Sequence, residues 1–83
     1  MAQKFIKVDN MKELDLHGIK HADAFRKIDQ FIGYHIQRGT GEVYVVTGYS
    51  QEMKKIVNEV LKDYGATSKD EFGNDGKLIV SLT

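Results

Sequence analysis

Leu14-Asp15-Leu16-His17-Gly18 has the pattern of a short strand that runs into a glycine turn. Because successive side chains of a strand point to opposite faces, Leu14 and Leu16 share one face while Asp15 and His17 share the other. Aspartate is depleted in strands, yet here a carboxylate lies beside an imidazole. The pair comes at the carboxyl end of the strand, where α/β folds place their ligand sites. The stretch therefore predicts a strand and a candidate site at its end.

Two helical patterns and three further strand patterns follow this stretch. Over residues 21–38 apolar positions recur with a helical period, at Ala24, Phe25, Ile28, Phe31, Ile32, His35 and Ile36. A second stripe predicts a helix between the cap residue Ser50 and Gly65, with Met53, Ile56, Val57, Val60, Leu61 and Tyr64 on one face. We expect strands over residues 42–47, 66–72 and 77–82, with a turn at Gly73-Asn74-Asp75-Gly76 before the last.

The order of these elements determines the expected fold. Strand, helix, strand, helix, strand, strand corresponds to a four-stranded mixed sheet, and two helices can cover only one of its faces. The prediction is an α/β fold, more narrowly an α+β two-layer sandwich, whose parallel connections are right-handed. Leu14 and Leu16 should then face the helices, while Asp15 and His17 face away from them.

Composition and charge limit the class of protein. The chain has 83 residues, enough for one domain, which we place at residues 12–83 after an extended N-terminal arm over residues 1–11. Cysteine is absent, which excludes disulfides and thiolate metal sites. Since no apolar run has membrane-spanning length and no signal pattern is present, we expect a cytoplasmic protein without membrane contact. Twelve basic residues balance twelve acidic ones, so any nucleic-acid contact would depend on a local patch.

A second loop is expected at the same edge of the sheet. In a strand–helix–strand unit the two strands are parallel, so their carboxyl ends lie at one edge of the sheet. If the two strands are neighbours, Thr47-Gly48-Tyr49-Ser50 lies beside His17-Gly18. Each loop precedes a helix, whose first backbone N–H groups attract anions. Together with Lys20 and Lys54, the two loops could form a phosphate cradle with an acid–base group at its rim.

Each of these features also has a plain structural explanation. Any strand-to-helix turn favours glycine and a serine cap, and this loop lacks the lysine spacing of a nucleotide-binding phosphate loop. His17 could equally be a turn residue that hydrogen-bonds locally, and Asp15 a solvated strand residue. Tyr49 is either an exposed loop side chain or a surface on which a base stacks. His17 and His21 do not share a helix and His35 lies near the far helix end, so we expect no metal site and a packed His35.

These residues resemble the Smr (small MutS-related) domain family over residues 12–83. One family signature is a DLHG stretch, which Asp15, Leu16, His17 and Gly18 match. The other is a glycine-rich loop, commonly TGxG or HGxG; Thr47 and Gly48 match its start, Tyr49 stands where a lysine or another residue is common, and Ser50 replaces the usual second glycine. The resemblance implies a stand-alone member of the family, with a fold similar to the C-terminal domain of bacterial translation initiation factor three.

The resemblance also implies a protein that processes nucleic acid, because family members are nucleases or nucleic-acid binders. We expect a metal-independent endonuclease, without a cofactor, that acts on RNA in preference to DNA. His17 would supply acid–base chemistry and Asp15 would orient it. The expected substrate and phosphate contacts are Gly18, Lys20, Thr47, Gly48, Tyr49, Ser50 and Lys54. The alternatives are a non-catalytic module that binds nucleic acid or the ribosome and, third, a protein-interaction adaptor; the oligomeric state is open.

Overall fold

The computed structural model describes residues 12–71 and 74–82. Its elements, in chain order, are β1 (Glu13–Asp15), α2 (His21–Gln37), β2 (Glu42–Val46), α3 (Gln51–Tyr64), β3 (Thr67–Glu71) and β4 (Asn74–Ser81). The predicted element order is therefore confirmed. The N-terminal arm predicted for residues 1–11 lies outside the described residues.

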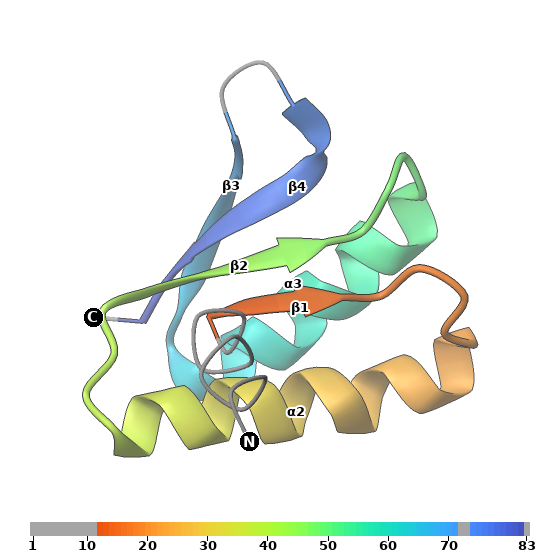
Figure 1. Cartoon of the computed structure of the whole chain (residues 1–83). Coiled ribbons are helices and arrows are strands. Elements are labelled where there is room, and N and C mark those ends of the chain that lie inside the picture. Colours follow the sequence, from red (N-terminus) through yellow and green to blue (C-terminus); the bar gives the residue numbers. More distant parts are fainter. Residues whose placement is uncertain (1–11, 72–73, 83) are drawn as a thin grey trace, which may run out of the picture.

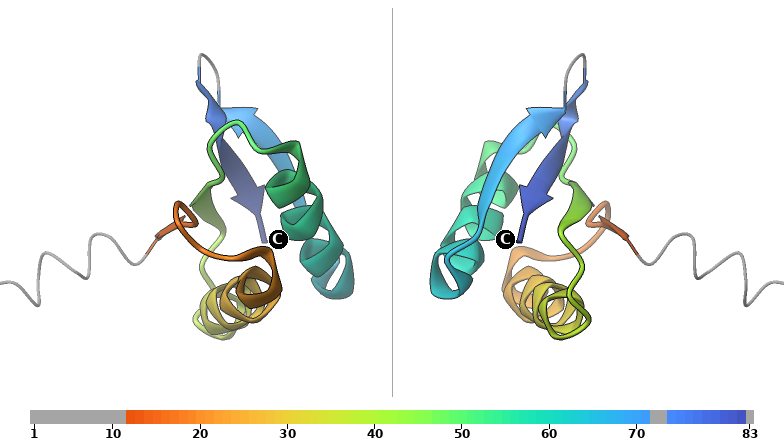
Figure 2. Two further views of the ribbon diagram at one scale, coloured as in Figure 1. Left: turned by 90° about the vertical axis from the view of Figure 1, so that its right-hand side faces the viewer. Right: turned by 90° about the vertical axis from the view of Figure 1, so that its left-hand side faces the viewer.

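One mixed four-stranded sheet carries both helices on a single face, as Figures 1 and 2 show. The strand order is β1-β2-β4-β3. β1 pairs with β2 in parallel, whereas β4 is antiparallel to both β2 and β3. The predicted two-layer sandwich is correct, and so is the prediction that the first two strands are neighbours. Their carboxyl ends consequently meet at one edge of the sheet.

The core lies between the sheet and the two helices. Leu16 is 2% exposed and Leu14 packs partly buried against the same core, so this face of β1 is the one that the alternation predicts. The buried apolar side chains are Leu16, Ala24, Ile28, Ile32, Val43, Val45, Met53, Ile56, Val57, Val60, Leu61, Leu78 and Val80. The opposite face of the sheet carries no helix, which leaves Asp15 and His17 exposed.

Three side chains that we predicted on the apolar stripes are exposed instead. Phe25 and Ile36 each follow a buried residue, Ala24 and His35, and so lie about 100° farther round the helix. Tyr64 lies in the last turn of α3, where its hydroxyl donates to the Asp29 carboxylate at 2.7 Å. A hydrophobic period identifies the centre of a helix face more reliably than its margins.

The helix that leads away from the second loop has the predicted ends. Ser50 Oγ accepts a hydrogen bond from the Met53 backbone N–H at 3.1 Å, and Gly65 ends α3 with a left-handed φ of 67°. The first helix ends at Gln37, one residue before the predicted position. None of the helices in the described ranges is long and apolar enough to cross a membrane.

The last strand begins earlier than predicted. Of the expected turn at 73–76, residue 73 lies outside the described residues, and Asn74 already belongs to β4, where it pairs with Glu71. The Gly76 carbonyl accepts hydrogen bonds from the N–H groups of Thr47 and Gly48. Pairing on both sides of β4 thus outweighs the low strand propensity of glycine, asparagine and aspartate. The first strand, in turn, ends at Asp15, and His17 begins a turn.

Candidate functional site

Asp15 and His17 form a hydrogen-bonded pair at the end of β1. Asp15 Oδ1 lies 2.9 Å from the His17 backbone nitrogen, which donates to it, and 2.9 Å from His17 Nδ1. The first of these bonds closes an Asx turn, which is how the sequence DLH brings the carboxylate round to the imidazole. Because a carboxylate only accepts hydrogen bonds, Nδ1 carries the hydrogen and Nε2 is left for other partners.

The Asp15 carboxyl is a stable anion in this arrangement. The His17 backbone N–H lowers the pKa of Asp15, desolvation partly opposes this, and the His17 ring lowers it further. Both side chains remain open to solvent, with His17 65% and Asp15 63% exposed. The pair can therefore meet a ligand without rearrangement of the core.

The glycine of the second loop contacts the histidine ring. Gly48 has a φ of +65°, and a Cβ placed on it would lie 3.1 Å from His17 Nε2 and 3.6 Å from Cδ2. The ring therefore lies against the Gly48 backbone, at a distance that leaves little room for a side chain. The two loops meet in space, as the parallel pairing of β1 and β2 predicts.

The second loop is held by hydrogen bonds to β4 and within itself. The N–H groups of Thr47 and Gly48 donate to the Gly76 carbonyl at 2.9 and 3.0 Å. The buried Thr47 hydroxyl donates to the Gly48 carbonyl at 2.9 Å. The Gly48 N–H, which we expected to hold a phosphate, is thus already paired. The Met53 N–H of α3 already donates to Ser50 Oγ, so the N–H groups of Gln51 and Glu52, which have no acceptor within the helix, are the donors on this side.

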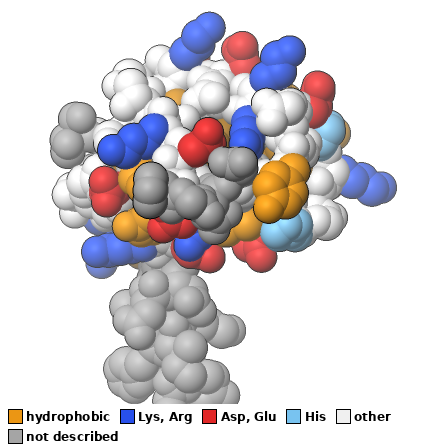
Figure 3. Space-filling model, turned by 90° about the horizontal axis from the view of Figure 1, so that it is seen from above, with side chains coloured by type: hydrophobic (Ala, Val, Ile, Leu, Met, Phe, Trp, Pro, Cys, Tyr) orange, Lys and Arg blue, Asp and Glu red, His pale blue; other side chains and the backbone are white. Residues whose placement is uncertain are grey.

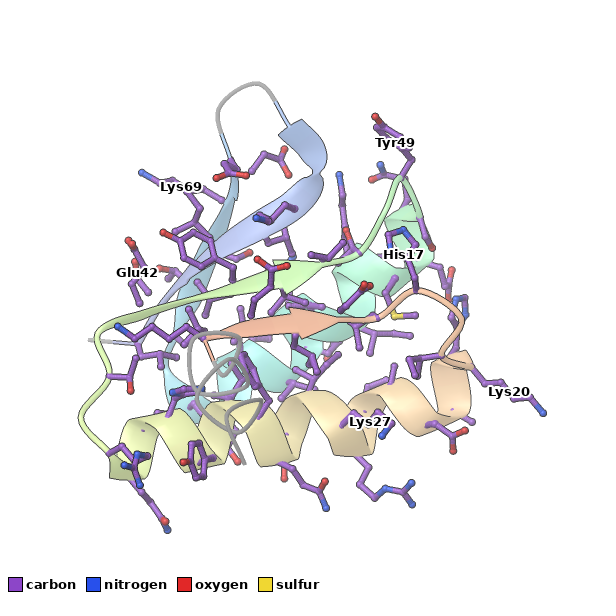
Figure 4. The ribbon with its side chains drawn as sticks, in the orientation of Figure 1. His17, Lys20, Lys27, Glu42, Tyr49 and Lys69 are labelled. Atoms are coloured by element: carbon purple, nitrogen blue, oxygen red, sulfur yellow. The ribbon has the colours of Figure 1, made fainter. Side chains whose placement is uncertain are left out.

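A surface hollow of about 580 Å³ brings these segments together. It is lined by His17, Val46, Thr47, Gly48, Tyr49, Ser50, Gly76 and Lys77. Tyr49 is 80% exposed, and Figure 4 shows it at the outer end of its loop, above His17. The hollow therefore offers an imidazole, a hydroxyl and an aromatic ring to a ligand that lies across the sheet edge.

Two lysines that we predicted for this site lie elsewhere. Lys54 Nζ is 3.6 Å from Asp70 Oδ1, between α3 and β3. Lys20 precedes α2, and its side chain points away from His17 in Figure 4. Neither is among the residues that line the hollow. Gly18, with a φ of +75°, forms the turn after His17.

Lys77 is the basic side chain that reaches the hollow, and sequence reasoning missed it. Its Nζ lies 3.1 Å from Glu13 Oε1 and 3.9 Å from Glu71 Oε1, and 5.4 Å from the centre of the Tyr44 ring. Alternation with the buried Leu78 could have placed Lys77 on the outer face of its strand. Its neighbours, however, depend on the strand order, which the residues alone do not show.

The face of the molecule that Figure 3 draws is mixed in charge. Seen from above in Figure 3, basic and acidic side chains are interspersed instead of forming one basic band. His35 is buried, as expected, and its Nδ1 lies 3.0 Å from Thr40 Oγ1. Within residues 12–71 and 74–82 no three histidine, aspartate or glutamate side chains gather as a metal site would require.

Comparisons with known proteins agree on one family. A family model described as the Smr domain matches residues 14–83. The crystal structure of YdaL, a stand-alone small MutS-related protein from Escherichia coli, superposes with a TM-score of 0.65 and 17% sequence identity. The match covers 87% of the present chain and 64% of YdaL, so the chain spans less than two thirds of that protein's length. No curated protein matches the chain.

Proposed function

The chain belongs to the Smr domain family, and from that starting point we propose that it is a metal-independent endonuclease that cuts RNA with His17. Family membership indicates a function on nucleic acid. The single observation that supports the nuclease proposal is the Asp15–His17 pair, which leaves Nε2 of an exposed imidazole beside the hollow. The pair has the geometry of an oriented acid–base group.

His17 acts on the proton of the attacking or leaving oxygen. As a base, Nε2 accepts the proton of the 2′-hydroxyl next to the scissile phosphate, and water protonates the departing 5′-oxygen. In the alternative, the imidazolium gives its proton to the departing 5′-oxygen, and water accepts the proton of the 2′-hydroxyl. In both cases Asp15 holds the hydrogen on Nδ1, and its negative charge stabilises the imidazolium form. Asp15 is therefore a positioning residue, while His17 is the catalytic one.

RNA suits a site with a single acid–base pair better than DNA does. The 2′-hydroxyl of RNA is an internal nucleophile already held next to its phosphate. An imidazole that removes one proton is then sufficient to start the reaction. DNA lacks this hydroxyl, so the same site would also have to position a water molecule. RNA is accordingly the proposed substrate.

The loop residues would bind the strand on either side of the cut. Tyr49 offers an exposed ring on which a base can stack. Ser50 lines the hollow, and the N–H groups of Gln51 and Glu52 that follow it would donate to a phosphate there. Thr47 contributes indirectly, because its buried hydroxyl fixes the Gly48 peptide against which His17 rests.

Cleavage of a labelled single-stranded RNA in EDTA tests this proposal. Wild-type protein should cut the strand and leave a cyclic phosphate, while His17→Ala should lose activity by about 10²–10⁴-fold. Asp15→Asn should lose less, because the ring remains but its orientation is weakened. His21→Ala, which removes an exposed histidine at the start of α2, is the matched control and should cut normally. Equal cleavage by wild type and His17→Ala would disprove the proposal.

A second candidate is a module that binds RNA or the ribosome without cutting. The pairing of the Gly48 N–H with Gly76, the pairing of Lys54 with Asp70 and the mixed surface charge all favour it. It predicts RNA binding that weakens with salt and no cleavage product from any variant. The EDTA experiment separates the two candidates, because only the nuclease yields product.

A further inference from the structure

Lys77 stands in the same row of the sheet as Asp15. Asp15 pairs with Val46 across β1 and β2, and Val46 pairs with Lys77 across β2 and β4. Directly paired residues point to the same face of a sheet. Lys77 therefore projects from the outer face, two strands away from Asp15, and lines the same hollow as His17.

The Lys77 ammonium is held by carboxylates. Glu13 on β1 lies 3.1 Å from it and Glu71 on β3 lies 3.9 Å from it, while the Tyr44 ring lies beneath. Glu13 raises the pKa of Lys77, which burial opposes in part, so the amine is a cation at neutral pH. Its side chain is only 24% exposed. The Lys77 ammonium is thus a positive charge at the hollow, and Glu13 and Glu71 hold it in place.

We propose that Lys77 binds a phosphate of the nucleic-acid strand next to His17, and that Glu13 occupies Lys77 until the phosphate arrives. This inference rests on the proposed action on nucleic acid. It assigns the phosphate contact to β4 instead of to Lys20 and Lys54, which lie outside the hollow.

The exchange of partners has a simple electrostatic basis. A lysine–glutamate pair that is open to water on one side, as Lys77 and Glu13 are at 24% and 43% exposure, contributes modest net free energy, because water partly screens it. A phosphate in the hollow offers the same ammonium a charge-assisted hydrogen bond. Glu13 is 43% exposed at its side chain and can turn to solvent when it is displaced. In the reaction, Lys77 would also stabilise the charge that develops on the phosphate oxygens.

Binding of a fluorescein-labelled 2′-O-methyl RNA in EDTA, followed by anisotropy at several salt concentrations, tests the inference. This probe has the phosphates of RNA but no free 2′-hydroxyl, so binding is measured whether or not the protein cuts RNA. Lys77→Gln should weaken binding by about fivefold and lower the slope of log affinity against log salt by about 0.7, the value for one lost phosphate contact.

A double-mutant cycle tests the role of Glu13. Glu13→Gln releases Lys77 and should tighten binding by about twofold, which reflects the modest strength of an ion pair at the surface. In the Lys77→Gln background the same change should have no effect, because no ammonium remains to be released. If Glu13→Gln tightens binding equally in both backgrounds, Glu13 acts only through its own charge and the proposed exchange is wrong.

Lys69→Gln and Glu42→Gln are the matched controls. Both side chains are exposed, both lie away from His17 in Figure 4, and neither lines the hollow. They should leave the salt slope within error of wild type. If Lys69→Gln lowers affinity and slope as much as Lys77→Gln does, the strand contacts diffuse surface charge and the inference is overturned.

Inorganic phosphate, titrated into ¹⁵N-labelled protein, provides the second arm. Shifts of the Gly48, Gly76 and Lys77 amides that disappear in Lys77→Gln would support the phosphate site directly. If those shifts appear but the RNA does not bind, the site takes free phosphate and the proposed function fails. If the RNA binds wild type and Lys77→Gln alike, the inference fails and the proposed function stands. Thermal unfolding of each variant verifies that it is folded.

Discussion

At the scale of single residues, the candidate site depends on the Asp15 carboxylate and on the absence of a side chain at Gly48. The Asp15 carboxylate hydrogen-bonds to the backbone N–H and the ring of His17, because only one residue separates the two. Gly48 then lets the ring lie against the neighbouring loop, since it has no Cβ to fill that space. Strand alternation places Asp15 and His17 on one side of the sheet, but the contact itself is made by the Asx turn, because β1 ends at Asp15. The parallel pairing of β1 and β2 brings the two loops together. The sequence does not predict that the Gly48 N–H donates to the Gly76 carbonyl.

Replacement of Gly48 by alanine should disturb His17 directly. The left-handed φ of +65° costs an L-residue about 1–2 kcal/mol, and the new Cβ would press on Nε2 from 3.1 Å. We expect a lower melting temperature and a changed ¹H–¹³C NMR signal of the His17 ring. Gly39→Ala is the matched control, because Gly39 has a φ of +74° and nothing within 4 Å of the added Cβ. An unchanged His17 signal in Gly48→Ala, or an equal change in both variants, would contradict this prediction.

At the scale of elements, helix α3 links the fold to the site. Its stripe of buried side chains fixes it on the sheet, and its first turn follows directly from the Thr47–Ser50 loop. The sequence predicts this helix, its serine cap and its glycine end, because all three are local signals. It does not predict that Lys54, in the second turn, faces β3 and pairs with Asp70. That contact depends on where β3 returns to the sheet.

Ser50→Ala should weaken the start of α3. The Ser50 hydroxyl accepts the Met53 N–H at 3.1 Å, and loss of such a cap costs about 1 kcal/mol of unfolding free energy. For a domain of this size, that corresponds to a fall in Tm of about 4–8 °C. Ser68→Ala, which removes an exposed side-chain hydrogen bond to Asn58, should cost less. Calorimetry measures both, and a larger loss in Ser68→Ala would show that the cap is not the stabilising contact.

At the scale of the whole molecule, the two faces of the sheet have separate tasks. One face is covered by α2 and α3 and contains the core. The other face carries no helix, and the hollow lies at its edge, where β1 and β2 end. Stability and the proposed chemistry should therefore respond to different substitutions.

Leu61→Ala should reduce stability without changing the site. Leu61 is 1% exposed in the core, and such a truncation costs about 2–5 kcal/mol. Below the lowered melting temperature, the affinity for the 2′-O-methyl RNA should equal that of wild type. Ile36→Ala, at a position 36% exposed, should cost much less. Denaturant unfolding gives the two free energies, and weaker RNA binding by folded Leu61→Ala would show that core and site are coupled.

The sequence by itself determined the element order, the two-layer fold, the buried face of β1, the centres of the buried faces of α2 and α3, and the shared side of Asp15 and His17. These follow from side-chain periods and turn signals within a few consecutive residues. Only the tertiary structure decided the strand order β1-β2-β4-β3, and with it the place of Lys77 on the same hollow as His17 and of Lys54 beside Asp70. Strand pairing joins segments that are far apart in the chain, and no local pattern encodes which edge accepts the last strand. The DLH stretch thus specifies the acid–base pair, while the pairing of β4 with β2 places Lys77 at the same hollow.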